Sequence, residues 1–248
     1  MARVAPTIPE ETALLCEKCG YIINGISTES VCPECATPIL ESLPDTRQPP
    51  LWEQQSGSAI TRFILTTIQL IFTPARFFRS INSRADLEKS ASFARGHYWI
   101  SSLLFGATAY VHGIWAWPFL WYDRPIDTRP VYGILMLTLF SALAYWLLVI
   151  TASLAARLTA WEAAYRGLRL PRQVVQRALH YHSAHYLPVA LLAFATVVGH
   201  QILITIAPSM DRYGFRYLYI LCALVILSAG YLFSTYWKGM RNLMYANG

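Results

Sequence analysis

The chain has 248 residues, of which 55% are hydrophobic and only 14% are charged, and its mean hydropathy is +0.36. Soluble domains carry roughly 25% charged residues, so the composition excludes an ordinary soluble enzyme, and the high hydrophobicity excludes a disordered chain. The formal charge of +6 is unevenly divided, because residues 1–53 hold three basic and eight acidic side chains and the remainder holds seventeen basic and six acidic. We therefore expect an acidic soluble head on a basic, apolar membrane part.

Two cysteine pairs of the form CxxC stand near the amino terminus, separated by twelve residues. The four cysteines are Cys16, Cys19, Cys32 and Cys35. Each pair can form a tight turn around its sulfurs, and Asn24-Gly25 is typical of a hairpin turn between them. Four thiolates at this spacing favour tetrahedral Zn²⁺, so residues 1–41 are predicted to form a small β zinc ribbon. Two disulfides, or an iron centre of rubredoxin type with the same ligands, are the alternatives.

The predicted zinc is structural, because four thiolates leave no coordination position for water or a substrate. A ribbon this short has little core, so metal binding should supply most of its folding free energy. Lys18 is the only basic residue between the first and the last cysteine, whereas binding of phosphates needs positive charge. The ribbon is therefore expected to bind a protein partner and no nucleic acid. Residues 42–58, which are rich in proline, are predicted to be a flexible linker.

Apolar residues recur at helical spacing between Ile60 and Ile81, flanked by arginines and interrupted by Pro74. The uncharged part of this segment, residues 63–75, would reach only ~20 Å as a helix. The pattern favours a helix that lies in the membrane interface and is kinked or ends near Pro74. A fifth, short crossing is the alternative. Residues 171–186 are predicted to form a second surface helix.

Four uncharged runs downstream are each at least 21 residues long, which is enough for a helix to cross the hydrocarbon core. The charged stripes expected of a soluble helical bundle do not occur in these runs. We therefore predict an all-α polytopic membrane domain over residues 59–248, with four transmembrane helices besides the interfacial ones. The predicted spans lie near 98–121, 131–155, 187–207 and 215–237.

Basic side chains gather in the segments on one side of these spans. Residues 54–96 carry six basic side chains against two acidic ones, and residues 157–186 carry five against one. The positive-inside rule therefore predicts that both termini are cytosolic. The basic faces are expected to attract anionic lipid head groups. The first fifteen residues lack the apolar core of a cleavable signal peptide.

The first and third spans match each other when the chain is shifted by 88 residues. The shift places His97 on His185 and His112 on His200, which predicts a duplicated hairpin whose first and third helices run in the same direction. The four histidines are candidate ligands of two haem groups held between these helices. Hydrogen bonding between helices is the alternative.

A second histidine cluster, His180, His182 and His185, is a candidate for a surface transition-metal site or for an interfacial anchor. Cys222 is isolated in the last span and is predicted to be a packing residue. The central parts of the four spans contain no carboxylate, lysine or arginine, Arg216 standing at the very start of the last one, and this disfavours active transport. Since no GxSxG, HExxH or phosphate-binding loop occurs either, we expect that the protein is not an enzyme.

The run CEKCGYIINGISTESVCPECATPILESL, residues 16–43, resembles the amino-terminal zinc ribbon of a group of bacterial multi-pass membrane proteins of unassigned role. These share CxxCGY, a short hairpin and CPEC, and Ala36 stands where they usually have glycine. The membrane part, about residues 60–240, is similar to Yip-family domains, which usually have five spans and in eukaryotes are implicated in vesicle traffic and Rab binding. The resemblances imply a helical fold in the bacterial plasma membrane without known chemistry.

These patterns predict a non-catalytic, multi-pass membrane protein that presents a cytosolic zinc ribbon to a protein partner or to a membrane complex. The alternatives are a haem-binding electron-transfer subunit and a passive channel or carrier.

Overall fold

The computed structural model describes residues 13–44, 47–55, 57–80, 87–116, 129–168, 170–207, 214–245 and 247. The chain divides into two compact units. Unit 1 comprises Met1–Ala94, Ala152–Ala184 and Ser234–Gly248, and unit 2 comprises Arg95–Thr151 and His185–Phe233. Three long helices contribute residues to both units.

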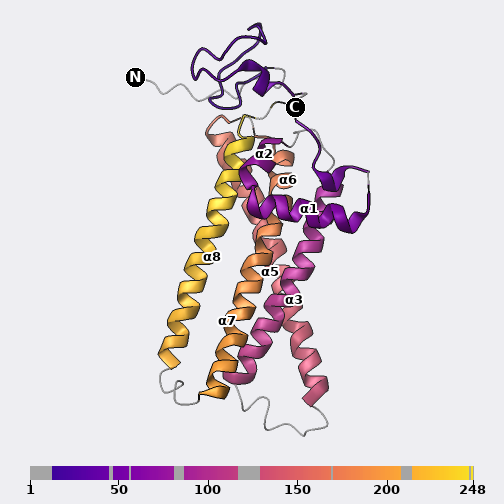
Figure 1. Ribbon diagram of the computed structural model, residues 1–248, viewed down its shortest axis with the longest axis vertical. Helices are drawn as coiled ribbons and strands as arrows, with labels where there is room; N and C mark the ends of the chain where they lie inside the picture. Colours follow the sequence, from indigo (N-terminus) through magenta and orange to yellow (C-terminus); the bar gives the residue numbers. More distant parts are fainter. Residues whose placement is uncertain are drawn as a thin grey trace. The chain divides into compact units, whose positions relative to one another are not determined.

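The described residues are mostly helical, as the sequence predicts, and they contain no strand. In chain order the helices are η1 (Ile39–Ser42), η3 (Leu51–Glu53), α1 (Ala59–Phe72), α2 (Pro74–Ser80), α3 (Leu87–Ala116), α5 (Arg129–Tyr165), α6 (Arg172–His182), η5 (Ser183–His185), α7 (Tyr186–Ile206) and α8 (Gly214–Leu243) (Figure 1). The predicted β ribbon is not supported, because residues 13–44 form only two isolated β-bridges.

Three stretches of helix are long and apolar enough to cross a membrane: Arg129–Tyr165, Arg172–Ile206 and Tyr217–Leu243. They contain the spans predicted near 131–155, 187–207 and, from Tyr217 onward, 215–237. Their apolar side chains largely face outward. Along α5 the four leucines at positions 135, 139, 143 and 147 are all exposed at intervals of one helical turn. A row of exposed leucines favours apolar surroundings, so the three stretches are consistent with a membrane protein.

A fourth crossing, predicted near 98–121, is not confirmed. The corresponding helix is α3, and it does not belong with the three apolar stretches. Its first turns carry Glu88, Lys89 and Arg95, and its middle buries the polar side chains of Ser101 and Ser102. These residues lower its hydropathy. Residues 117–121 lie outside the described part of the chain.

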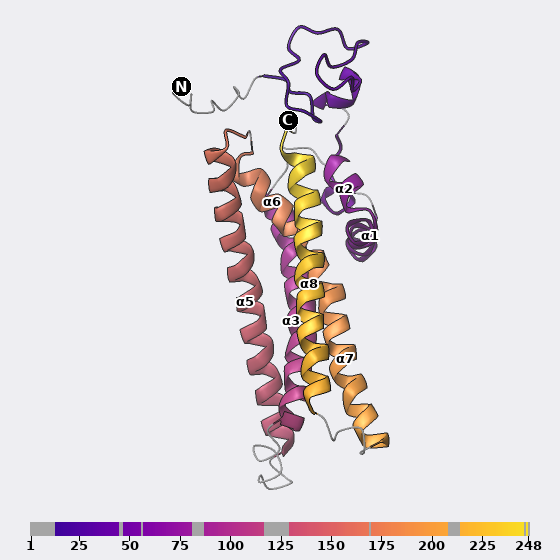
Figure 2. The ribbon, with the colours of Figure 1, turned by 90° about the vertical axis from the view of Figure 1, so that its left-hand side faces the viewer.

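The short helices of unit 1 follow the proline positions. α1 ends at Phe72 and α2 begins at Pro74, which confirms the predicted break there, and the two helices run in different directions (Figure 2). Phe77 on α2 and Phe93 on α3 both pack against Tyr181 of α6, with ring centroids 5.2 Å apart. This aromatic cluster forms the centre of the apolar core of unit 1.

Residues 47–55, which lie within the predicted linker 42–58, pack against helices α3 and α6 inside unit 1. Glu53 is buried and accepts hydrogen bonds from the Arg177 guanidinium at 3.0 Å (Nε) and 2.8 Å (Nη2). The Tyr181 hydroxyl donates a third bond to the same carboxylate at 2.6 Å. An aromatic residue beside the pair, Trp52, contacts Phe93 and donates its indole N–H to the Lys89 carbonyl oxygen. This segment is therefore attached to α3 and α6.

We predict that Glu53→Gln destabilises the protein by about 3 kcal/mol, because it leaves the buried Arg177 charge without its partner. The measurement is the thermal denaturation midpoint of the full chain in a non-ionic detergent. Glu162→Gln is the matched control. It breaks an ion pair with Arg166 whose side chains are 52% and 62% exposed, and it should cost only about 0.5 kcal/mol. Equal midpoints for the two variants would contradict the structural role of Glu53.

Candidate metal centre

The four cysteines lie in two turns of the same design. We call residues 13–44 the cysteine module. In the first turn the Cys16 N–H donates to the Tyr21 carbonyl and the Gly20 N–H donates to the Cys16 carbonyl, both at 2.8 Å. In the second, Cys32 is bonded in the same way to residues 37 and 36, at 2.8 and 2.9 Å. An isolated β-bridge closes each turn. The chain therefore builds the same cysteine turn twice.

Both turns need a left-handed backbone directly after the second cysteine. Gly20 has a φ of 79° and Ala36 a φ of 56°. Glycine adopts this conformation without steric cost, whereas an alanine Cβ crowds the backbone. The second turn has Ala36 where the first has Gly20, and its backbone is therefore the more strained of the two.

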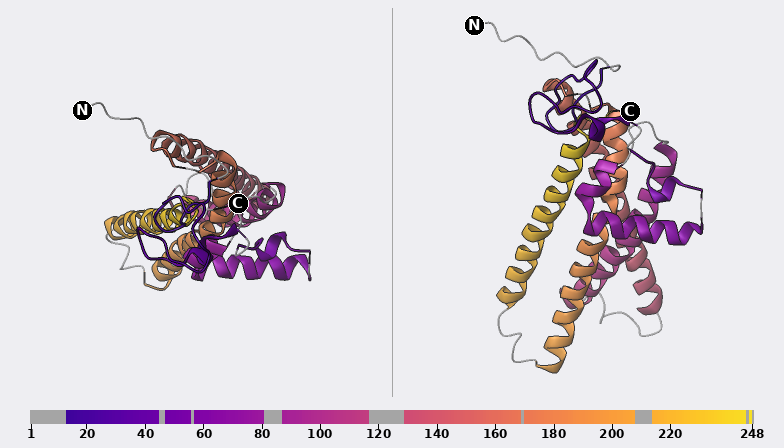
Figure 3. Two further views of the ribbon diagram at one scale, coloured as in Figure 1. Left: turned by 90° about the horizontal axis from the view of Figure 1, so that it is seen from above. Right: turned by 45° about the horizontal axis from the view of Figure 1, so that its top comes forward.

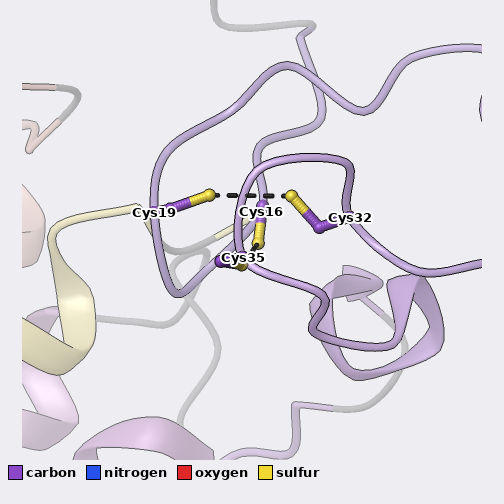
Figure 4. Close-up of side chains that lie close together, drawn as sticks. All are labelled: Cys16, Cys19, Cys32 and Cys35. Carbon is purple, nitrogen blue, oxygen red and sulfur yellow. Dashed lines mark hydrogen bonds between the residues drawn. The ribbon is translucent and has the colours of Figure 1, made fainter.

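The two turns bring all four sulfurs together (Figure 4). The Sγ atoms lie within 4.8 Å of one another. The Cys16–Cys35 and Cys19–Cys32 pairs are 3.5 and 3.6 Å apart. Four sulfurs at ~2.3 Å from a tetrahedral zinc are ~3.8 Å apart, so the arrangement fits a four-thiolate metal site. All four cysteines are free. The two disulfides that were the alternative to a metal site are therefore not formed in this structure.

The electrostatics of the sulfurs are uneven. Burial raises the pKa of Cys16, and desolvation raises that of Cys19 to about 12. Hydrogen bonding to Thr37, through its hydroxyl and its backbone N–H, lowers the pKa of Cys35 to about 6. A metal ion held by all four sulfurs must displace protons from the thiols. Binding is therefore expected to weaken as the pH falls.

The module has almost no apolar interior of its own. Its core cluster consists of Cys16, Ile23, Cys32 and Ile39, and the only other buried hydrophobic residues among residues 13–44 are Ala13 and Leu15. Two of the four cluster residues, Cys16 and Cys32, are candidate metal ligands from different turns, so a bound metal would join the two turns through this core. A core of this size is too small to fold on its own. A metal bound by the four cysteines would therefore stabilise the fold of the module.

A buried arginine attaches the module to the helices of unit 1. Arg47 donates two hydrogen bonds, at 2.7 and 2.6 Å, to the carboxylate of Glu17, which lies inside the first cysteine pair. The same guanidinium donates to the Phe78 carbonyl on α2 and to the Asn242 carbonyl on α8, both at 3.3 Å. Sequence reasoning missed this contact, because nothing in the composition of residues 42–58 distinguishes Arg47 from a solvated charge.

The end of the chain makes a second attachment. The Asn247 amide N–H₂ donates to the carbonyls of Leu15 and Ser42, at 2.7 and 2.6 Å, and its Oδ1 accepts from the Leu15 N–H at 2.9 Å. Figure 3 (right) shows the cysteine module next to the end of α8. Arg47 and Asn247 thus hold the module in unit 1.

The candidate haem ligands have protein contacts in unit 2, where α3 and α7 run in the same direction (Figure 1). His112 and His200 meet at one residue, Tyr217. The His112 Nδ1 is 3.0 Å from the Tyr217 hydroxyl, and the His200 ring stacks on the same tyrosine with centroids 3.9 Å apart. The His185 Nδ1 is 2.8 Å from the Tyr231 hydroxyl, and His97 is fully buried. The tyrosines on α8 were not predicted.

The three histidines of the second cluster, all of them in the described part of the chain, are not close enough together to share a metal ion. The His180 Nδ1 is 2.9 Å from the Ser90 hydroxyl, and the His182 Nε2 is 3.0 Å from the Thr235 hydroxyl. These contacts direct the two rings to different helices. In the part of the chain that the structure describes, the four cysteines are the only group of three or more histidine, cysteine, aspartate or glutamate side chains close enough to share a metal ion.

No family model matches the chain, and no curated protein or solved structure gives a significant match. The two family resemblances noted in the sequence therefore remain expectations.

We predict that the purified protein carries about one metal ion per chain and that Cys32→Ser reduces this content at least tenfold, because three thiolates and a serine hydroxyl no longer hold the ion. Elemental analysis by mass spectrometry is the measurement. Cys222→Ser is the control, since Cys222 is a free cysteine outside the module, and it should leave the metal content unchanged. Metal-free wild-type protein, isolated without chelators, would contradict the assignment.

Proposed function

We propose that this chain is a non-catalytic, multi-pass membrane protein that uses a zinc-stabilised cysteine module to recruit a protein partner. In this proposal the metal is zinc, α3 contributes a fourth crossing near 98–121, and both termini are cytosolic at the plasma membrane of a bacterium. The helical membrane character and the metal-binding cysteine cluster support it. So does the resemblance of residues 16–43 to the zinc ribbons of bacterial membrane proteins.

The observation that carries the proposal is the apolar surface of the cysteine module. Ile22 and Val31 are each 52% exposed and Leu40 is 59% exposed, although the module is short of core residues. The adjacent Ile23 and Ile39 are buried. The module therefore keeps some of its large apolar side chains in a small core and leaves others on its surface. Contiguous exposed apolar side chains mark interaction surfaces, and we propose that these three side chains belong to one such surface.

The closed ligand set gives the same indication. Four thiolates fill the coordination sphere of a tetrahedral ion, so a metal bound there has no position for a substrate. A module of this kind acts by binding other molecules through its surface and not by chemistry at the metal. Neither the haem alternative nor the channel alternative has a comparable observation in its favour among the described residues.

We predict that Ile22→Glu or Val31→Glu reduces partner capture at least tenfold, because each places a charge on the apolar contact. The tagged full-length chain is solubilised from cells, and its co-purifying proteins are quantified by mass spectrometry. Thr28→Glu adds the same charge at an exposed polar position of the module and should leave capture unchanged. All variants should retain their metal.

Identical sets of co-purifying proteins for wild type, Ile22→Glu and Val31→Glu would refute the proposal. Point substitutions are preferable to removing residues 1–50, because that deletion also removes Arg47 and the contacts it makes with α2 and α8.

A further inference from the structure

A groove of about 1050 Å³ lies between the cysteine module and the last turns of α8, inside unit 1. One wall is formed by the cysteine turns and η1. The other is formed by the end of α8 and by Arg79 of α2, whose Nε donates to the Asn242 side-chain oxygen at 3.4 Å. Pockets of several hundred Å³ hold small-molecule ligands, so the groove has room for a polar head group.

The charge of the groove is positive. Four basic side chains line it, Lys18, Arg79, Lys238 and Arg241, against two acidic ones, Glu17 and Glu41. The Glu17 carboxylate is already neutralised by its ion pair with Arg47 at 2.6 Å. By contrast, the side-chain nitrogens of Lys18, Lys238 and Arg241 make no hydrogen bond or ion pair with any described residue. Such a set of donors suits an anion, and ammonium and guanidinium groups are the usual protein ligands of phosphate.

The groove also lies where a membrane surface would be. Its α8 wall forms the last part of Tyr217–Leu243, one of the three stretches able to cross a membrane. Trp237 lines the groove and is 50% exposed, and tryptophan is enriched where a spanning helix leaves the hydrocarbon. Trp237, Arg241 and Tyr245 follow one another at intervals of four residues, so an aromatic contact and a cation share one face of the chain end.

We infer that this groove binds the phosphate of an anionic phospholipid, with the head group between Lys238 and Arg241 and the acyl chains alongside α8. The inference rests on one part of the proposed function, that α8 crosses the membrane. It goes beyond a general attraction of basic segments to lipid, because it assigns the lipid to one groove, half of which is made by the cysteine module.

The test uses the purified full chain in a neutral detergent and native mass spectrometry of bound lipid. The probes are dioleoyl phosphatidylglycerol, dioleoyl phosphatidylcholine and inorganic phosphate. The double variant Lys238→Gln/Arg241→Gln removes two groove cations. Arg76→Gln/Arg172→Gln removes two exposed cations of unit 1 that do not line the groove and is the matched control.

Wild type and the control should bind phosphatidylglycerol with similar affinity, and the groove variant should bind it about 30-fold more weakly, as expected from the loss of two cations near a lipid phosphate. Phosphatidylcholine should bind wild type no better than it binds the groove variant. Unchanged metal content and helical circular dichroism would show that the groove variant is folded.

Two results would overturn the inference. One is equal loss of phosphatidylglycerol binding in the groove and control variants, which indicates general charge attraction. The other is displacement of phosphatidylglycerol by millimolar inorganic phosphate, which indicates a soluble anion as the natural occupant. Partner capture depends on Ile22 and Val31 and is measured separately, so either proposal can fail while the other stands.

Discussion

The position of the cysteine module depends on the buried guanidinium of Arg47. A charge that is removed from water must be paired, or it costs several kcal/mol. Arg47 meets this requirement with the Glu17 carboxylate and with carbonyl oxygens from α2 and α8. Because Glu17 lies between Cys16 and Cys19, the ion pair connects the first cysteine turn directly to the helices. Glu53 and Arg177 repeat the principle a few residues later, so two buried ion pairs determine the course of the segment between the module and α1.

Local features of the sequence predicted much of this structure. The CxxC spacing identified all four sulfurs that come together, because the ligands of each turn are three residues apart and need no distant contact. Pro74 marked the boundary between α1 and α2, since proline lacks the N–H that would continue a helix. Uncharged runs located three apolar stretches of helix.

The features that sequence reasoning missed depend on residues far apart in the chain. Glu53 and Arg177 are separated by 124 positions, and His112 and Tyr217 by 105; no periodicity or motif links such pairs. The prolines of residues 42–58 indicated a flexible linker, yet Pro50 directly precedes η3 in a packed segment. The expected β ribbon is limited to single bridges, because each cysteine turn is closed by one pair of residues. In α3, buried serines replace the apolar side chains that a clear spanning helix would carry.

Asn247 has a consequence for the order of events during biosynthesis. Its amide holds Leu15 and Ser42, residues that leave the ribosome long before it does. The cysteine turns can close as soon as residue 35 has emerged. Their attachment to unit 1, however, needs the end of α8 and Asn247, four positions after it. Among the described parts of the chain, the segment that is translated first is therefore fixed in place last, after the ribosome has finished the membrane helices.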